Sequence, residues 1–309
     1  MAHYVPDDPD GFVDEVEQKI RDHVLRVMPH DPSGELEGSS LDSLLLTYGN
    51  WRSRFVHPHP RTVHLSAQLR AAGSNVTGHQ TAFAAIVAAL EAGHKVTPYL
   101  SRGIKTAYVP RAQRSRQLHR RPDLDLLISD WGLHHLHLTT ELESDGFVKR
   151  TEDLLFAAFT DRDAYLIGIY PHGSWVLREL VEVLVREWPD NPAVVVSLSG
   201  VSLAHSVSED EHLQLRKGGI ATLVEVDGRV VMPGFGMTTA GTPVRVTVRV
   251  NDIERAITDL RGNLDARLSA LDEKYPVADG ATATWEPWLE DDTWGLRRGD
   301  LVVSIADLW

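Results

Sequence analysis

The pattern at the centre of this chain is Asp130-Trp131-Gly132-Leu133-His134-His135-Leu136-His137-Leu138, which places three histidines in what reads as a β-strand. Alternate side chains of a strand share one face of the sheet. His135 and His137 are therefore expected on one face, and His134 with the leucines at 136 and 138 on the other. Because histidine exchanges protons near neutral pH and is a common metal ligand, the stretch predicts one core face and one face that carries a functional site.

The composition excludes several kinds of site. The 309 residues include no cysteine, so disulfides, thiolate nucleophiles, iron–sulfur clusters and cysteine zinc sites are ruled out. Hydrophobic residues make up 42% of the chain and charged residues 24%, as in a soluble globular protein. The formal net charge of -13 opposes nonspecific attraction to nucleic acid, so such a partner would have to meet a local basic patch.

One segment offers such a patch. Between Arg102 and Arg121 the chain carries seven Lys and Arg residues and no acidic residue. The segment predicts contact with nucleic acid, and Arg114 and Arg116 at its centre are candidate substrate-binding residues. A solvated surface segment or a loop that docks a protein partner is the alternative interpretation.

The sequence shows no sign of membrane insertion or of a nucleotide-binding motif. No apolar run is long enough to span a bilayer, and residues 1–10 lack the basic and apolar regions of a signal peptide. We therefore expect a cytoplasmic protein with no membrane partner. A Walker-type loop, a Gly-x-Gly-x-x-Gly after a strand and a Gly-x-Ser-x-Gly elbow are also absent, which argues against a nucleotide triphosphatase or a dehydrogenase.

Helical spacing of apolar residues predicts three helices in the first two thirds of the chain. They cover Phe12–Met28, Thr81–Ala92 and Leu177–Trp188. Gly93 is expected to end the second helix, and Ser174 is expected to cap the start of the third.

Strand patterns surround these helices. Apolar runs at 153–160 and 164–170, separated by three charged residues, predict a short hairpin, while the prolines within 51–64 favour a loop or an edge strand. Asp227-Gly228 predicts a second hairpin. Residues 244–250 continue the β pattern, and Asn251 is predicted to cap a long amphipathic helix that ends near residue 271.

These elements predict an α+β protein in three parts. A helical N-terminal region with the basic segment is expected over 1–122. A central α+β domain, with a mainly antiparallel sheet and flanking helices, is expected over 123–215. A β-rich C-terminal domain with one long helix is expected over 216–309.

Side chains suited to phosphate chemistry flank the predicted central sheet. A histidine can shuttle a proton, a cation can stabilise developing negative charge, and an aromatic ring can stack on a base. The predicted catalytic residues are His135, His137, Arg150 and His172. The predicted substrate-binding residues are Lys149, Tyr165, Tyr170, Arg114 and Arg116.

Residues 125–188 resemble the RelE/ParE/YoeB ribonuclease toxin superfamily. The resemblance is carried by His135-Leu136-His137-Leu138, Lys149-Arg150, Leu154-Leu155-Phe156-Ala157, Tyr165-Leu166-Ile167-Gly168-Ile169 and His172. It implies a metal-independent endoribonuclease of toxin or defence type that needs no cofactor. RNA would be the substrate, and a protein antitoxin or another protein would be the partner.

The resemblance also implies a role for each catalytic residue. His135 or His137 would help to take the proton of the ribose 2′-hydroxyl, and His172 would protonate the leaving oxygen. Arg150, with Lys149, would stabilise the phosphorane. The arginine of this superfamily lies inside the middle strand, where this chain has Asp153-Leu154, so Arg150 would have to act from the preceding turn.

Two other functions stay open. The first is a metal-dependent hydrolase in which Asp130 joins His135, His137 and His172 as a ligand, because a His-x-His pair on a strand offers two ligands on one face. The second is a noncatalytic module that binds nucleic acid or a protein. In the simplest structural interpretation, His134 is a hydrogen-bonded core histidine and the other two histidines lie on a polar sheet face.

Overall fold

The computed structural model describes residues 8–30, 34–73, 78–189, 195–276 and 284–309 and has a mixed α+β fold. The predicted fold class is therefore confirmed. The chain divides into two compact units, one made of residues 1–52 and 246–309 and the other of residues 53–245. This division differs from the three consecutive parts expected from the sequence, because unit 1 is assembled from both ends of the chain. None of the described helices is long and apolar enough to cross a membrane.

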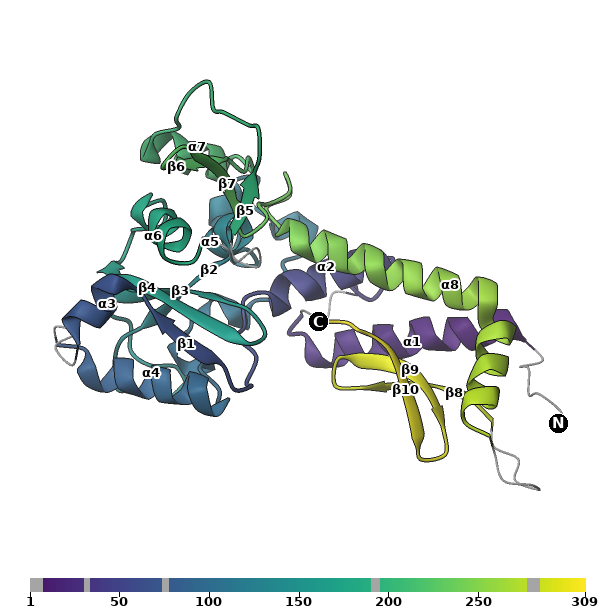
Figure 1. Ribbon diagram of the computed structural model, residues 1–309. Helices are drawn as coiled ribbons and strands as arrows, with labels where there is room; N and C mark the ends of the chain where they lie inside the picture. The colour runs from purple at the N-terminus through teal and green to yellow at the C-terminus, as the bar shows by residue number, and fades with distance from the viewer. Residues whose placement is uncertain (1–7, 31–33, 74–77, 190–194, 277–283) are drawn as a thin grey trace. The chain divides into compact units, whose positions relative to one another are not determined.

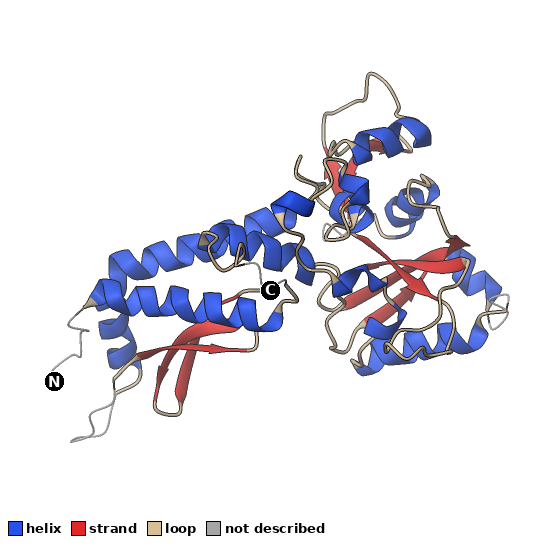
Figure 2. Ribbon diagram, turned by 180° about the vertical axis from the view of Figure 1, so that it is seen from behind, coloured by secondary structure: helices blue, strands red, loops and turns tan. Residues whose placement is uncertain are grey.

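Unit 1 combines helices with a three-stranded antiparallel sheet of order β10-β9-β8 (Figure 2). Its elements are α1 (Pro9–Val27), α2 (Leu41–Arg52), α8 (Val244–Lys274, in this unit from Val246), β8 (Glu286–Glu290), β9 (Thr293–Arg298) and β10 (Leu301–Asp307). Asp292, in the turn between β8 and β9, accepts hydrogen bonds from Arg52 (2.6 Å), His23 (3.1 Å) and Tyr48. This carboxylate thus ties the sheet to α1 and α2.

The predictions for residues 244–251 were wrong, because this segment is the first part of helix α8. Its alternating valines match a strand, but they also place Val246 and Val250 four residues apart, on one face of a helix. Both are buried, and the same face continues through Ile253 and Ile257. Packing along this longer stripe outweighs the β preference of valine, and Asn251 lies inside the helix instead of capping it. The helix bends at Asn263, whose φ of -132° is not helical.

Unit 2 is built on a four-stranded sheet of order β1-β4-β3-β2 (Figure 1). The strands are β1 (Thr62–Leu65), β2 (Leu133–His137), β3 (Asp153–Phe159) and β4 (Asp163–Pro171). β2, β3 and β4 are antiparallel neighbours, so the hairpin predicted at 153–170 is confirmed. β1 pairs in parallel with β4 at the sheet edge, as the prolines around it suggested.

Helices cover both faces of this sheet. α3 (Ala67–Ala72) and α4 (Gln80–Ala92) pack on one face, and α5 (Leu126–Trp131) and α6 (Glu179–Glu187) pack on the other (Figure 1). The predicted alternation is confirmed, because Leu136 and Leu138 belong to the core under α4 whereas Leu133 belongs to the core under α5 and α6. The expectation of a single core face was wrong, since apolar residues of α5 and α6 bury most of the face that also carries His135 and His137.

A second sheet, with three strands, completes unit 2. It has the order β5-β7-β6, with β5 (Val195–Leu198), β6 (Val224–Val226) and β7 (Arg229–Pro233), and α7 (Glu209–Lys217) precedes β6. The hairpin predicted at Asp227-Gly228 is confirmed, and both residues have positive φ, as a type I′ turn requires. After β7, Gly234 lies directly against the backbone of Gly132. A Cβ added at Gly234 would be 2.3 Å from the backbone nitrogen of Gly132. The loop therefore lies against the junction of α5 and β2, where only glycine fits.

Candidate functional site

One pocket of unit 2, about 340 Å³ in volume, is lined by all four predicted catalytic residues. His135 and His137 reach it from β2, Arg150 from the turn before β3, and His172 from the residue after β4. The strand register explains this meeting. His137 pairs with Leu154 at the start of β3, and Asp153 pairs with Pro171 at the end of β4. Antiparallel pairing thus brings the ends of β2 and β4 beside the beginning of β3.

His137 has a fixed ring and a defined tautomer. The backbone N–H of Thr151 donates a hydrogen bond of 3.1 Å to Nδ1 of His137. Because Nδ1 accepts, the proton of the neutral ring lies on Nε2. Burial lowers the pKa of His137 to about 4, and the nearby His135 and Arg150 charges act in the same direction. At neutral pH His137 is therefore an uncharged hydrogen-bond donor.

His135 lies in an aromatic environment. Its ring centroid is 4.8 Å from that of Trp175 and 6.2 Å from that of His137, and Trp175 also contacts the ring of His172 at 4.9 Å. Nδ1 of His135 is buried without a hydrogen-bond partner in the described part of the chain. Burial lowers the pKa of His135, the carboxylate of Asp125 opposes this shift, and His172 reinforces it. His135 is therefore neutral and able to accept a proton.

Arg216 on α7 also lines the pocket, and it was not among the predicted site residues. Its Nε donates to Asp130 (2.7 Å), its guanidinium lies 4.3 Å from the ring centroid of Trp131, and it donates to the carbonyl of Trp175. Asp130 also accepts from Nε2 of His212 (2.8 Å), which lies one helical turn from Arg216. A buried carboxylate thus holds a cation at the pocket and, through it, the segment that carries Trp175. The single sequence signal was the spacing of His212 and Arg216, four residues apart on a helix.

The predicted substrate-binding residues are not part of this pocket's lining. Tyr165 and Tyr170 are core residues, and the hydroxyl of Tyr170 donates to Gln68 and Glu179. Their assignment as base-stacking residues is corrected, because packing under α6 leaves their rings inaccessible. Lys149 is exposed and forms an ion pair with Glu141.

The basic segment is largely tied to the protein. Arg102 and Lys105 form ion pairs with Asp145, and Arg121 pairs with Asp123. Arg114 lies 4.9 Å from the ring centroid of Tyr108 and donates to the carbonyl of Val109, while Arg116 is exposed. Leu118 and His119 are the residues of this segment that line the pocket, and Ser101, just before the segment, lines it as well. The segment therefore contributes less free positive charge than its composition predicts.

The negative charge of the chain does not belong to the unit that holds the pocket. Unit 2 carries 20 Asp and Glu and 20 Lys and Arg residues, whereas unit 1 carries 24 and 11. Around the pocket, the cationic residues Arg150, Arg216 and Lys217 and the imidazole of His119 face one carboxylate among the lining residues, that of Asp125. The net charge of -13 is therefore no argument against an anionic ligand at this site.

The geometry does not favour the metal-dependent interpretation. Within the described ranges, no three His, Asp or Glu side chains are grouped so that they could hold a metal ion. Asp130, the proposed carboxylate ligand, is occupied by Arg216 and His212 instead.

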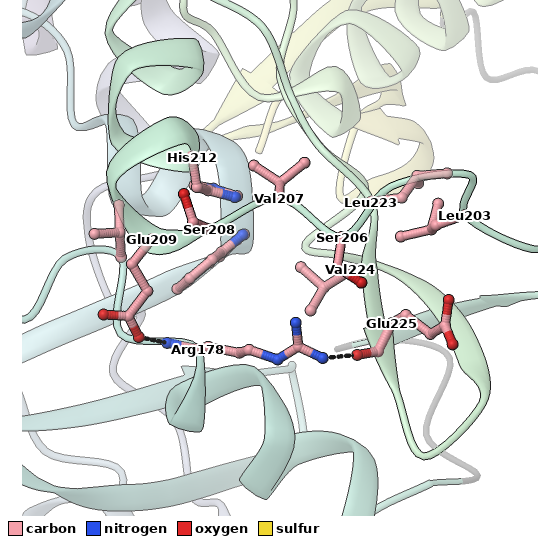
Figure 3. Close-up of a pocket in the computed structure, with 12 residues that line it drawn as sticks. Arg178, Leu203, Ser206, Val207, Ser208, Glu209, His212, Leu223, Val224 and Glu225 are labelled. Carbon is pink, nitrogen blue, oxygen red and sulfur yellow. Dashed lines mark hydrogen bonds between the residues drawn. The ribbon is translucent and has the colours of Figure 1, made fainter.

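A second, much smaller hollow lies between α6, α7 and β6 (Figure 3). Its volume of about 20 Å³ has room for roughly one water molecule. The backbone N–H of Arg178 donates to Glu209 (2.8 Å), and its guanidinium donates to the carbonyl of Glu225, as the dashed lines in Figure 3 show. These bonds tie the start of α6 to α7 and β6, so the residues around the hollow hold these elements together.

Comparison of the chain with protein-family models, with curated proteins and with solved structures gives no match. The resemblance of residues 125–188 to the ribonuclease toxin superfamily therefore stays a prediction.

His134 provides a first testable prediction. It is 5% exposed, and a weak hydrogen bond with the backbone of Ser53 only partly offsets its burial, so it is less well satisfied than the interpretation as a hydrogen-bonded core histidine requires. Burial, with added repulsion from Arg245, lowers the pKa of His134 from 6.5 to about 3. The unfolded chain takes up this proton below its ordinary pKa, whereas the folded protein does not. The neutral ring of His134 therefore contributes its full stability above the ordinary pKa of 6.5. Below that pH the free energy of unfolding falls by about 1.4 kcal/mol per pH unit.

Replacing His134 with Phe should make the unfolding free energy fall less steeply between pH 6 and 4.5, by the contribution of one proton. Urea unfolding at several pH values measures this slope. The exposed His205, whose side chain is 72% accessible, supplies the control His205→Asn, which should keep the slope of the unchanged protein. Equal slopes for His134→Phe and the unchanged protein would show that His134 is not held neutral.

Proposed function

We propose that this pocket binds a phosphodiester of RNA and that the protein cleaves RNA without a metal ion. The observation that carries the proposal is the convergence of His135, His137, His172 and Arg150 on one pocket that also contains the buried Arg216. Imidazoles supply proton transfer, and the guanidinium groups supply charge for a phosphate oxygen. A protein antitoxin or another protein partner, a toxin or defence role and a cytoplasmic setting belong to the same proposal.

The reaction requires a base, an acid and a group that stabilises the phosphorane. The ribose 2′-oxygen attacks the adjacent phosphorus, its proton passes to a base, and the bond to the 5′-oxygen breaks as that oxygen receives a proton from an acid. The products are a 2′,3′-cyclic phosphate and a 5′-hydroxyl. No oxidant, reductant or metal is needed for this balance.

The hydrogen bonds of the pocket distinguish the two strand histidines. His137 presents Nε2–H when neutral, because its Nδ1 is occupied by Thr151, so it is suited to donate to a nonbridging phosphate oxygen. His135 is left as the proton acceptor. His172, which is exposed at the end of β4, takes the role of the acid. A bound phosphodiester anion favours the charged forms of His135 and His137 and so opposes the lowering of their pKa values by burial.

The test is cleavage of a single-stranded RNA oligonucleotide by the full chain, with and without a chelator. We expect cleavage that survives chelation and yields a 2′,3′-cyclic phosphate. An oligonucleotide with 2′-deoxyribose throughout is the matched control and should stay intact, because it lacks the attacking hydroxyl. Loss of activity on chelation, or equal cleavage of the deoxy substrate, would overturn the proposal. Tight RNA binding without cleavage would leave a noncatalytic binding module.

A further inference from the structure

The pocket has an aliphatic wall as well as a polar one. Five leucines line it together with the imidazoles and cations, namely Leu118, Leu124, Leu126, Leu127 and Leu213. All except Leu127 keep part of their surface exposed instead of being sealed in the core. A phosphate group alone gives no reason for exposed leucines beside arginine and histidine, because apolar surface in water is costly.

Three of these leucines form a continuous surface around one glycine. A Cβ added at Gly241 would lie 2.9 Å from Leu124 Cδ1, 3.2 Å from Leu118 Cδ1 and 3.3 Å from Leu126 Cδ2. Gly241 has a φ of +82°, so the turn that supports the wall needs glycine for its backbone as well as for space. The wall is therefore a built part of the pocket and not a set of scattered side chains.

We propose that this wall receives the base of one unstacked nucleotide whose phosphate lies at the imidazoles, so that the substrate is single-stranded RNA. This inference rests on the proposed function and specifies its substrate. A volume of about 340 Å³ is at the small end of ligand pockets, which suits one nucleotide and excludes a stacked strand. Bases within a duplex are paired and stacked and cannot enter such a pocket unless they are flipped out.

The distribution of charge supports a nucleotide as occupant. The apolar wall can cover one face of a base. Asp125 lies in the same lining, and while its Oδ1 accepts from the backbone N–H groups of Leu127 and Ile128, its Oδ2 can accept from an amino or imino group on the edge of the base. Trp175 lies between His135 and His172, in ring contact with both. Its fluorescence therefore reports on ligands that reach the imidazoles.

The experiment compares the binding of uridine 3′-monophosphate, adenosine 3′-monophosphate and inorganic phosphate to the full chain by calorimetry, with tryptophan fluorescence as a second readout. We expect at least one nucleotide to bind about tenfold or more tightly than phosphate. Leu118→Asn and Leu124→Asn should each weaken the nucleotide about tenfold and leave phosphate unchanged. Leu142→Asn is the matched control, because Leu142 is 63% exposed and outside this pocket, and it should change neither affinity.

The outcomes separate this inference from the proposed function. Cleavage of RNA together with equal affinities for nucleotides and phosphate would overturn the base site and leave the ribonuclease proposal standing. Preferential nucleotide binding without RNA cleavage would support the base site and overturn the ribonuclease proposal. Equal cleavage of an RNA duplex and the same strand alone would also overturn the inference. Thermal unfolding of each variant verifies that the Asn substitutions leave the protein folded.

Discussion

Replacing His135 with Gln is expected to lower the rate of RNA cleavage by about 10²–10⁴-fold, the usual contribution of a general base. Gln cannot accept a proton from the 2′-hydroxyl. His137→Gln should lower the rate much less, by about tenfold, because the side-chain amide can still donate a hydrogen bond near the position of Nε2. The contrast follows from the Thr151 N–H, which occupies Nδ1 of His137, whereas Nδ1 of His135 has no such donor among the described residues. Single-turnover cleavage of the same oligonucleotide measures both rates.

The pH profile gives an independent readout of the same assignment. In the unchanged protein, cleavage should fall on the acid side as the base becomes protonated, and this acid limb should be lost in His135→Gln. His205→Gln changes an exposed histidine that does not line the pocket and should have no effect. A larger loss in His137→Gln than in His135→Gln would reverse the two roles. Near-normal rates in both variants would remove catalysis from this pocket.

The convergence of the four predicted catalytic residues was predictable because it depends on local patterns. The strand around His135 alternates clearly, and the charged turn between β3 and β4 fixes a hairpin. Once three strands run antiparallel in sequence order, the end of β2, the start of β3 and the end of β4 must be neighbours. His137, Arg150 and His172 lie at those three strand ends and so lie at the same end of the sheet. This proximity can be predicted without knowing how the rest of the chain packs.

The remainder of the pocket could not be predicted in this way. Arg216 and Leu213 come from α7, and Leu118 and Leu124 come from segments with no regular period. Their placement depends on how α7 and the turn at Gly241 pack on the sheet, and no short-range pattern encodes that packing. The same limit explains the error at Tyr165, because an amphipathic ring suits a base-stacking site and a core equally well until the covering helix is known.

Helix α8 and the division of the chain show a second limit. A run of alternating valines satisfies both a strand and the i, i+4 stripe of a helix, and the choice is made by burial of Val246 and Val250. Unit 1 joins residues 1–52 to residues 246–309, and no local pattern in the sequence indicates that the two ends of the chain form one unit. The excess of acidic residues in unit 1 therefore determined the net charge of the whole chain. It obscured the equal numbers of acidic and basic residues in the unit that holds the pocket.

Asp130→Ala should lower the free energy of unfolding of unit 2 by about 3–5 kcal/mol, the usual cost of removing one partner from a buried ion pair. Asp130 is 1% exposed and is the carboxylate to which both Arg216 and His212 bind. Its loss leaves the guanidinium buried over Trp131 without its ion-pair partner. Glu141→Ala is the matched control, because Glu141 forms an exposed pair with Lys149 and such pairs contribute about 0–1 kcal/mol.

Denaturant unfolding followed by hydrogen exchange at the α5, β2 and α7 amides measures this loss within unit 2. The double variant Asp130→Leu with Arg216→Met should recover much of the stability, because apolar side chains of similar size often replace a buried ion pair without cost. It should nevertheless bind phosphate more weakly, since Arg216, one of the three Lys and Arg residues that line the pocket, is gone. A cost below about 1 kcal/mol for Asp130→Ala would mean that Arg216 finds another partner. Recovered stability with unchanged phosphate affinity would instead show that Arg216 only supports the fold, and that Arg150 and Lys217 bind the anion.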